Sequence, residues 1–191
     1  MARRDEGARR EAARGGWRYW GQERPPFAHA PGPDQESVWD YPRPPRVEPE
    51  LRRVEVYAGG HVVADSGRAM RVLETASPPT VYVPPGDVRM ELLERARGTT
   101  VCEWKGAATY YDVVTRDGLI SRAAWSYPDS LVGFEAIAGF LAFYPRAFYP
   151  RLLTCGLGGE TVAAQPGGFY GGWLTSDVVG PVKGDPEVFD R

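Results

Sequence analysis

The sequence predicts a mostly β fold in which two antiparallel sheets pack together, with one or two short helices. Apolar and polar residues alternate with a period of two over several short stretches, the pattern of half-buried strands. The 23 glycines and 18 prolines of the 191-residue chain place turns between these stretches. The predicted strands follow one another without the helices that join parallel strands. The pattern therefore favours packed antiparallel sheets over an α/β fold.

The two ends of the chain differ in composition from its middle. Residues 1–36 are rich in arginine and then in proline, which predicts an N-terminal arm that is mobile or lies along the surface. Residues 37–151 are expected to form the β domain, with a proline-rich lead-in that excludes a helix at its start. Residues 152–191 combine glycines with aromatic side chains, and we expect them to wrap around the domain as a C-terminal extension.

The first half of the domain is predicted to contain four strands and a helix. Ala58-Gly59-Gly60 separates two β-rich runs and is typical of a hairpin turn. Pro78-Pro79 is expected to interrupt the chain between the third and fourth strands. Asp87 is a suitable N-cap for a short helix. The predicted elements are strands at 54–57, 61–65, 68–74 and 80–83 and a helix at 87–95.

The second half of the domain is predicted to be built around a central hairpin. Arg116-Asp117-Gly118 forms its tight turn, and Lys105-Gly106 marks a second turn or bulge. Strand pairing across these turns would bring the two aromatic ends of the hairpin together. The predicted elements are strands at 99–104, 107–115, 119–125 and 140–144 and a small apolar helix around 134–138.

Composition excludes several classes of function. A net charge of −2 argues against binding of nucleic acid phosphates. Two cysteines and two histidines in distant segments are too few for a structural zinc site or a disulfide framework, and they favour a reducing compartment. The most apolar segment, residues 131–143, is too short to span a bilayer. We therefore expect a cytoplasmic protein that binds no metal, cofactor, nucleic acid or membrane.

Three residues are the candidates for chemistry. Cys102 is a candidate nucleophile, because Lys105 supplies a positive charge that lowers a thiol pKa; the alternative is a small buried apolar residue. Lys105 precedes a glycine and is a candidate anchor for an anionic group or a Schiff base, unless it pairs with Glu74 or Glu103. Glu74 is the candidate general acid or base, unless Arg68, Arg71 or Arg89 neutralises it.

Five further residues are candidates for ligand binding. Trp104, Trp125 and Tyr127 would form an aromatic wall for a flat or cationic ligand, although each of them alone is equally well explained as core packing. Tyr110 and Asp112 share one face of a predicted strand, because side chains alternate with a period of two. The three aromatic residues of the wall, taken together beside Lys105, favour a pocket.

Several long motifs in the chain resemble a known family. They are Trp39-Asp-Tyr-Pro, Val72-Leu-Glu-Thr, Cys102-Glu-Trp-Lys-Gly-Ala, Ala124-Trp-Ser-Tyr-Pro and Gly171-Gly-Trp173. Together they resemble the longer members of the bacterial domain-of-unknown-function family 427 over roughly residues 37–184. The resemblance implies a β-tent, which is two antiparallel sheets pinned at one end. It implies no reaction of its own.

Two features associated with that resemblance do not carry over to this chain. Similar β-tent modules often hold zinc through paired cysteines, and the sequence has no such pairs. The family has also carried a nucleotidyltransferase label, but the Gly-Ser and paired aspartates expected for that chemistry are missing from the sequence. The resemblance therefore contributes a fold and candidate positions.

Three functions remain open on the sequence alone. The favoured one is a small-molecule site with a lysine anchor, acting as a cofactor-free acid–base or covalent enzyme on a small carbonyl or amide compound. The second is a ligand-binding module that uses the same aromatic residues without chemistry. The third is a scaffold whose terminal arms join two copies into a homodimer.

Overall fold

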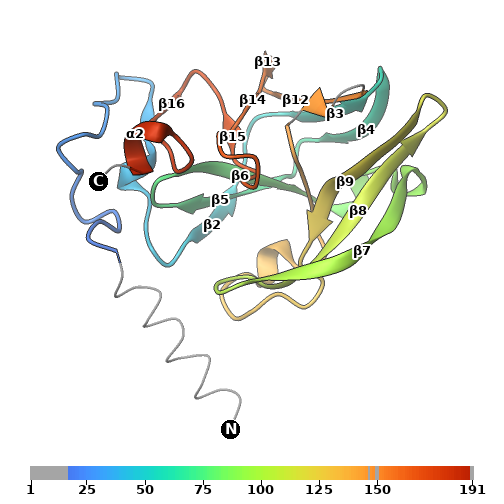
Figure 1. The fold of residues 1–191 in the computed structure, drawn as a ribbon, viewed down its shortest axis with the longest axis horizontal. Coiled ribbons are helices and arrows are strands. Elements are labelled where there is room, and N and C mark those ends of the chain that lie inside the picture. The colour runs from blue at the N-terminus through green and yellow to red at the C-terminus, as the bar shows by residue number, and fades with distance from the viewer. Residues whose placement is uncertain (1–16, 146, 149–150, 190–191) are drawn as a thin grey trace, which may run out of the picture.

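A computed structural model describes residues 17–145, 147–148 and 151–189 of the chain. Two antiparallel sheets dominate these residues (Figure 1), which confirms the predicted mostly β fold. The helices among the described residues are single turns: η1 (Val38–Asp40), η2 (Pro85–Asp87), η3 (Met90–Leu92), η4 (Glu135–Ile137) and α2 (Pro186–Phe189). None of these helices is long and apolar enough to cross a membrane.

The larger sheet has seven antiparallel strands, and its two longest strands lie at one edge. Adjacent strands are hydrogen-bonded in the order β2 (Arg46–Pro49), β5 (Met70–Glu74), β6 (Ser77–Val83), β10 (Leu141–Phe143), β9 (Gly118–Ser126), β8 (Gly106–Thr115) and β7 (Leu93–Cys102). The predicted central hairpin thus becomes a three-stranded meander of β7, β8 and β9, and β10 joins it to the first half of the domain.

The smaller sheet combines the first hairpin with strands that follow β10 in the chain. Its order is β11 (Ala147–Phe148), β12 (Arg151–Leu157), β3 (Val54–Ala58) and β4 (His61–Ser66), and β13 (Glu160–Thr161) also pairs with β12. Two short pairs complete the structure: β14 (Ala163–Ala164) with β15 (Trp173–Leu174), and β1 (Glu36–Ser37) with β16 (Val178–Val179). The last pair is parallel and joins segments from opposite ends of the chain.

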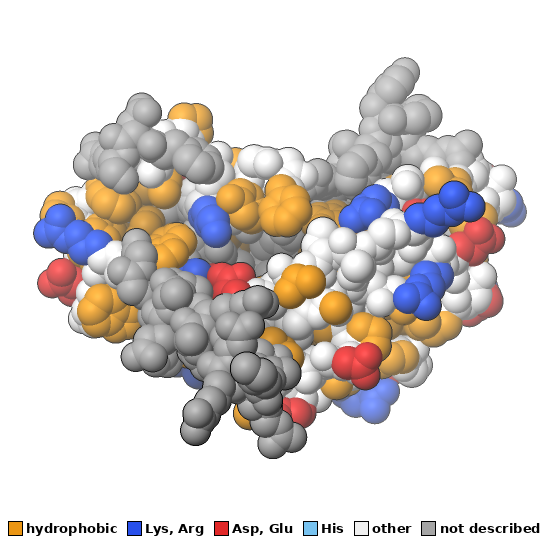
Figure 2. Space-filling model, turned by 60° about the horizontal axis from the view of Figure 1, so that its bottom comes forward, with side chains coloured by type: hydrophobic (Ala, Val, Ile, Leu, Met, Phe, Trp, Pro, Cys, Tyr) orange, Lys and Arg blue, Asp and Glu red, His pale blue; other side chains and the backbone are white. Residues whose placement is uncertain are grey.

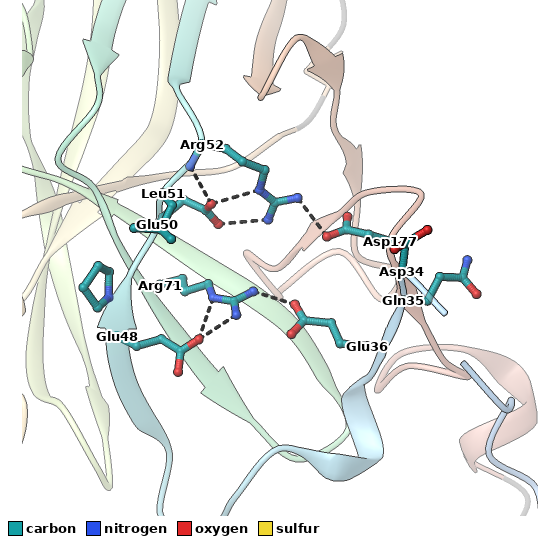
Figure 3. Close-up of a pocket in the computed structure, with 10 residues that line it drawn as sticks. Asp34, Gln35, Glu36, Glu48, Glu50, Leu51, Arg52, Arg71 and Asp177 are labelled. Carbon is teal, nitrogen blue, oxygen red and sulfur yellow. Dashed lines mark hydrogen bonds and ion pairs between the residues drawn. The ribbon is translucent and has the colours of Figure 1, made fainter. Parts of the chain in front are cut away.

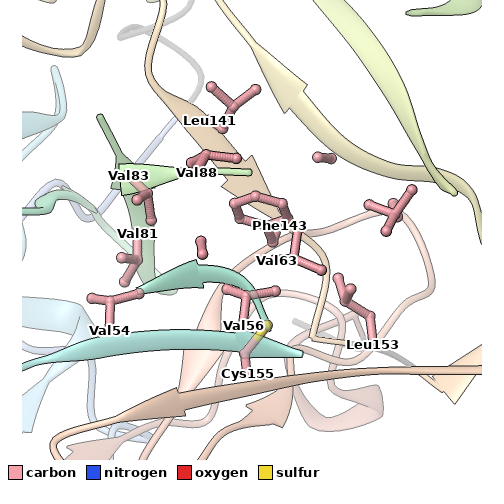
Figure 4. Close-up of a cluster of buried hydrophobic side chains, with 14 of the residues drawn as sticks. Val54, Val56, Val63, Val81, Val83, Val88, Leu141, Phe143, Leu153 and Cys155 are labelled. Carbon is pink, nitrogen blue, oxygen red and sulfur yellow. The ribbon is translucent and has the colours of Figure 1, made fainter. Parts of the chain in front are cut away.

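The main hydrophobic core lies between the two sheets (Figure 4). Val54 and Val56 of β3 contribute to it from the smaller sheet, and Val81 and Val83 of β6 contribute from the larger one. Burial of each such side chain stabilises the fold by about 1.5–3 kcal/mol. Alternation along a strand then sends Tyr82 to the opposite face of the larger sheet.

That opposite face carries the aromatic side chains of the second cluster. In β9, Ala124 belongs to the main core whereas Trp125 belongs to the second cluster, as the period of two requires. In β8, Tyr110 likewise belongs to the second cluster, and its neighbour Tyr111 packs against the main core. One face of the larger sheet therefore forms the domain interior, and the other presents aromatic rings.

The lead-in and the C-terminal segment pack against each other in a third cluster. Trp39 is 3% exposed, and its indole nitrogen donates a hydrogen bond of 2.9 Å to the Pro181 carbonyl. Its ring has edge contacts with Tyr19 and Phe27 of the N-terminal arm. The described part of that arm thus lies on the surface of its own domain, while residues 1–16 of it lie outside the described residues.

The helix predicted at residues 87–95 is wrong. Two isolated 3-10 turns occupy its beginning, and β7 starts at Leu93, well before the predicted start at residue 99. Asp87 does not cap a helix, because its carboxylate accepts a hydrogen bond of 2.7 Å from the Ser66 hydroxyl and pairs with Arg68. These contacts fasten the segment to the end of β4, and tertiary contact overrides the local capping signal.

Two smaller predictions are corrected as well. Pro78 and Pro79 do not interrupt the chain but lie inside β6, where β10 pairs only with Tyr82 and Val83 further along. Prolines are tolerated there because part of the strand lacks a second neighbour. The apolar helix predicted at 134–138 is reduced to the single 3-10 turn η4.

Candidate functional site

A pocket of about 220 Å³ lies on the aromatic face of the larger sheet, away from the main core. We call it the aromatic pocket. Its walls come from β5, β6, β7, β8 and β9, from the turn between β7 and β8, and from the C-terminal segment. The lining includes seven of the eight predicted site residues, namely Glu74, Cys102, Trp104, Lys105, Tyr110, Trp125 and Tyr127.

Trp104 and Lys105 reach the pocket from a tight turn rather than from a strand. β7 ends at Cys102 and β8 begins at Gly106, so both side chains project from the loop between them. Gly106 has a φ of 99°, and a Cβ there would lie 3.3 Å from the Asp129 carbonyl oxygen. A glycine is required because both the backbone angle and the space exclude a larger residue.

Lys105 is a buried cation that forms no ion pair with any described carboxylate. It is 8% exposed, and its ammonium nitrogen lies 5.9 Å from the ring centres of both Tyr127 and Phe134. Burial by itself lowers the pKa of Lys105, but the facing Cys102, Glu74 and Tyr127 more than offset this and raise the pKa above its ordinary value. The side chain therefore carries its charge at neutral pH.

Two buried polar groups in the pocket lining also lack hydrogen-bond partners among the described residues. The indole nitrogen of Trp104 is one, and the residue is 2% exposed. The hydroxyl of the fully buried Tyr82 is the other, although the Trp125 ring lies beside the Tyr82 ring, with 6.3 Å between their centres. Burial raises the pKa of Tyr82 well above its ordinary value, so the hydroxyl keeps its proton. Native structures leave few such groups unpaired, and a bound ligand is one explanation.

Glu74 is neutralised by an arginine from the lead-in. The Arg43 guanidinium lies 2.6 Å from the Glu74 carboxylate and 3.2 Å from that of Glu103. It also stacks between the rings of Trp17 and Trp104, at 4.4 and 5.4 Å from their centres. An arginine partner was the predicted alternative to catalysis, but the partner is Arg43, with a side chain 4% exposed, and none of the three arginines expected from the sequence.

Cys102 lines the pocket and is partly exposed, whereas Cys155 is buried in the main core. Burial raises the pKa of the Cys155 thiol, which makes it a packing residue. Cys102 differs because it lies in the pocket lining together with Lys105, and its thiol is directed at the Glu103 carboxylate, 4.0 Å away. Of the two thiols, it is the one with access to the pocket.

Asp112 is not part of the aromatic pocket. The alternation of β8 predicts it on the same face as Tyr110, but the pairing of β8 with β9 shifts register at this point. The Asp112 carboxylate accepts hydrogen bonds of 2.6 Å from the Arg122 backbone and 3.3 Å from the Ser121 hydroxyl. Asp112 thus satisfies the N–H group that the bulge leaves unpaired.

The C-terminal segment forms one wall of the aromatic pocket, and this wall was not predicted from the sequence. A Cβ on Gly171 would overlap the Trp125 ring, so the backbone lies directly on that ring. The Gln165 side chain accepts from the Gly172 backbone at 3.2 Å and donates to the Lys183 carbonyl at 2.7 Å. The lining residues from this segment are Gln165, Phe169, Tyr170, Gly171 and Lys183.

One signal in the sequence points to this wall. Lys105 and Lys183 are the two lysines of the chain, and all its other basic side chains apart from histidine are arginines. Both lysines line the aromatic pocket. Lysine and arginine present their charges differently. The presence of lysine at two positions in a chain that otherwise uses arginine is therefore the sequence signal that singles out Lys105 and Lys183.

The pocket opens to solvent beside apolar side chains. Val101 and Phe169 belong to its lining and are 78% and 65% exposed. Elsewhere the surface is mixed: Figure 2 shows Lys and Arg side chains scattered among acidic and hydrophobic ones on one face of the molecule. Among the described residues, no group of three or more His, Cys, Asp or Glu side chains is placed to hold a metal ion.

A larger cavity of about 440 Å³ lies elsewhere and is charged (Figure 3). We call it the charged cleft. Arg71 bridges Glu36 and Glu48, with N–O distances of 2.5 and 2.6 Å. Arg52 bridges Glu50 and Asp177, each at 2.9 Å. Both arginines of the cleft are thus neutralised by carboxylates of the chain, and its ion pairs link β2, β5 and the terminal segments.

Comparison with known proteins gives one match. A family model described as a domain of unknown function (DUF427) matches residues 46–151, which are more than half of the chain. A search of curated proteins found no significant match. The matched region contains Glu74 and the turn with Trp104 and Lys105, while Lys183 and the rest of the C-terminal wall lie outside it.

Proposed function

The chain belongs to the DUF427 family, and we propose that its aromatic pocket binds a small organic anion with a flat, apolar body. Lys105 anchors the anionic group, and the surrounding rings enclose the body. The observation that carries the proposal is the burial of Lys105 without a carboxylate partner among the described residues. The charged form of Lys105 is retained without an ion pair, so its ammonium donors are available to an anionic ligand.

The neighbouring polar groups support an anion rather than a cation. The Trp104 indole and the Tyr82 hydroxyl are buried donors without partners in the pocket lining. Together with the Lys105 ammonium they supply three kinds of N–H or O–H donor to a carboxylate-like group. The lining carboxylates Glu74 and Glu103 both pair with Arg43 and repel such a ligand less than free carboxylates would.

The walls and the volume limit the size of the ligand. The rings of Tyr82 and Trp125 form an edge contact at 6.3 Å, and Tyr144 lies 4.4 Å from Trp125, which leaves ring faces and edges around the cavity. Drug-sized ligands occupy pockets of about 300–1,000 Å³. A cavity of about 220 Å³ is smaller and suits a compound with a single ring.

Anchoring is favoured over a Schiff base at Lys105. A Schiff base requires the neutral amine, which a lowered pKa would supply. The pKa of Lys105 is instead raised by Cys102, Glu74 and Tyr127 against the opposing effect of burial. The protonated side chain binds an anion directly.

Calorimetric titration with benzoate, and with the isosteric but neutral benzamide, tests this function. We expect the wild-type protein to prefer benzoate, and Lys105→Met to lose about 1.5–3 kcal/mol of benzoate binding, the range for charged hydrogen bonds. This corresponds to a tenfold or larger change in Kd. Lys105→Arg keeps the charge and should retain part of the preference, while Arg116→Met, at an exposed arginine, should change nothing. Equal binding of benzoate and benzamide, or no binding of either, would reject the proposal.

A covalent activity is a second candidate, favoured by the position of the partly exposed Cys102 thiol in the pocket lining together with Lys105. The thiolate would attack an activated carbonyl, expel the leaving group with its electron pair and form a thioester that water hydrolyses. With p-nitrophenyl acetate, this chemistry predicts release of nitrophenolate that Cys102→Ser abolishes. Cys155→Ser is the matched control at the buried thiol. Equal rates in both variants would exclude Cys102 as the nucleophile.

A further inference from the structure

The two lysines of the chain both line the aromatic pocket, although 78 positions separate them in the sequence. Lys105 projects from the turn before β8, and Lys183 follows β16 in the C-terminal segment. From this we propose that the ligand carries two acidic groups on one flat body, and that Lys183 binds the second. This inference rests on the function proposed above and specifies its ligand class.

The backbone around Lys183 is held firmly against the domain. Its amide donates a hydrogen bond of 2.6 Å to the Ala76 carbonyl, and its carbonyl accepts one of 2.7 Å from Gln165. Gln165 is 4% exposed and is held in turn by the Gly172 amide. The position of Lys183 at the pocket is therefore set by buried contacts.

The Lys183 ammonium is surrounded by rings rather than by carboxylates. It lies 5.2 Å from the centre of the Tyr170 ring and 5.5 Å from that of Trp17. Among the described side chains it forms no ion pair. Aromatic faces attract a cation only weakly where it stays partly solvated, which leaves its charge available to an anion.

The neighbouring charges do not cancel the two lysines. Glu74 and Glu103 share the guanidinium of Arg43. The Glu103 side chain is 42% exposed, so solvent screens its charge. The pocket lining thus contributes two lysines and two carboxylates that share one arginine, which leaves a positive balance that a ligand with two acidic groups complements.

A pair of benzene carboxylates tests the inference. Isophthalate has two carboxylates on the ring and benzoate has one, and calorimetry at constant ionic strength compares them. We expect the wild-type protein to bind isophthalate at least tenfold more tightly than benzoate. Lys183→Met should remove that advantage while leaving the Kd of benzoate within twofold, and Lys183→Arg should retain part of it. Thermal unfolding of each variant confirms that it is folded.

The outcomes separate this inference from the function on which it rests. Equal affinity of the wild-type protein for isophthalate and benzoate, with both preferred over benzamide, overturns the second anion site and leaves the first. A similar loss of both ligands in Lys183→Met also overturns it, because it indicates a wall residue without charge selectivity. Absence of binding by both acids overturns the proposed function itself.

Discussion

The charged cleft and the aromatic pocket are both cavities formed where the terminal segments meet the larger sheet, yet they treat charge in opposite ways. In the charged cleft, Arg52 and Arg71 each bridge two carboxylates of the chain (Figure 3). In the aromatic pocket, Lys105 and Lys183 form no ion pair with a described carboxylate. The ion pairs of the charged cleft therefore link segments of the fold, whereas the proposed function assigns the lysines of the aromatic pocket to a ligand.

The choice of cation fits this division. Arginine offers a planar fork of donors that binds two carboxylates at once, which suits a structural bridge. Lysine offers a compact charge on a flexible stem, which suits a group that must reach a ligand. Removing a cation should therefore affect stability in the cleft and binding in the pocket.

The largest expected effect on stability is at Arg71. Arg71→Met leaves Glu36 and Glu48 without their shared cation, and we expect the free energy of unfolding to fall by about 2–3 kcal/mol. The pairs are 19–29% exposed, which places the loss below that of a fully buried pair. Urea denaturation measures it, and Arg46→Met, at a 58% exposed arginine that also pairs with Glu48, is the control.

Lys105→Met provides the contrast in the same measurement. We expect its free energy of unfolding to stay within about 1 kcal/mol of wild type, because the lost attraction to neighbouring groups is offset by the removal of a buried charge. A loss as large as that of Arg71→Met would show that Lys105 is a structural cation, and the distinction between the two cavities would fail.

The next effect concerns the C-terminal wall. Gly171→Ala places a methyl group in the space of the Trp125 ring, and overpacking of this kind costs about 1–3 kcal/mol. We expect a lower Tm together with weaker benzoate binding, because Trp125 lines the pocket. Gly67→Ala, where an added Cβ meets nothing within 4 Å, is the matched control. Unchanged benzoate binding in Gly171→Ala would show that the C-terminal wall does not contribute to ligand binding.

The charged cleft also predicts a dependence of stability on pH. Burial alone would raise the pKa of Glu50, but its hydrogen bonds with Arg52 more than offset this and lower the pKa below its ordinary value of 4.5. A carboxylate with a lowered pKa contributes stability above its unfolded pKa and loses it as the pH falls through the folded one. Unfolding free energies below pH 4.5 should therefore fall less in Glu50→Gln than in wild type.

The smallest expected effect is at Cys102. Cys102→Ser barely changes the volume of the side chain, so the Kd of benzoate should stay within about twofold of wild type, less than 0.5 kcal/mol. Calorimetry beside Lys105→Met measures it. A loss comparable to that of Lys105→Met would mean that the thiol, rather than the ammonium, dominates recognition in the pocket.

The sequence predicted the strands better than the turns and helices. The first hairpin appears as β3 and β4, and the strand predicted at 140–144 appears as β10. These predictions rest on alternation, which a half-buried sheet enforces directly. The helix at 87–95 rested on a single capping signal at Asp87, and Ser66 of β4 and Arg68, which follows it, bind that carboxylate instead.

Asp112 illustrates the same limit within the candidate site. Its face was predicted from the period of two, which holds only while the register is continuous. The bulge of β9 at Arg122, whose φ is 48°, breaks the register and redirects the carboxylate to the backbone. A bulge of this kind depends on the partner strand, and residues near Asp112 do not encode it.

The sequence by itself determined the class of fold and the concentration of reactive and aromatic side chains around Lys105, because period-two alternation and tight turns are local properties. Only the tertiary structure decided which charges are neutralised. Arg43 reaches Glu74 from a lead-in 31 positions away, and Lys183 reaches the pocket from the far end of the chain. Ion pairing and cavity formation depend on distances in space between remote segments, and no local pattern specifies them.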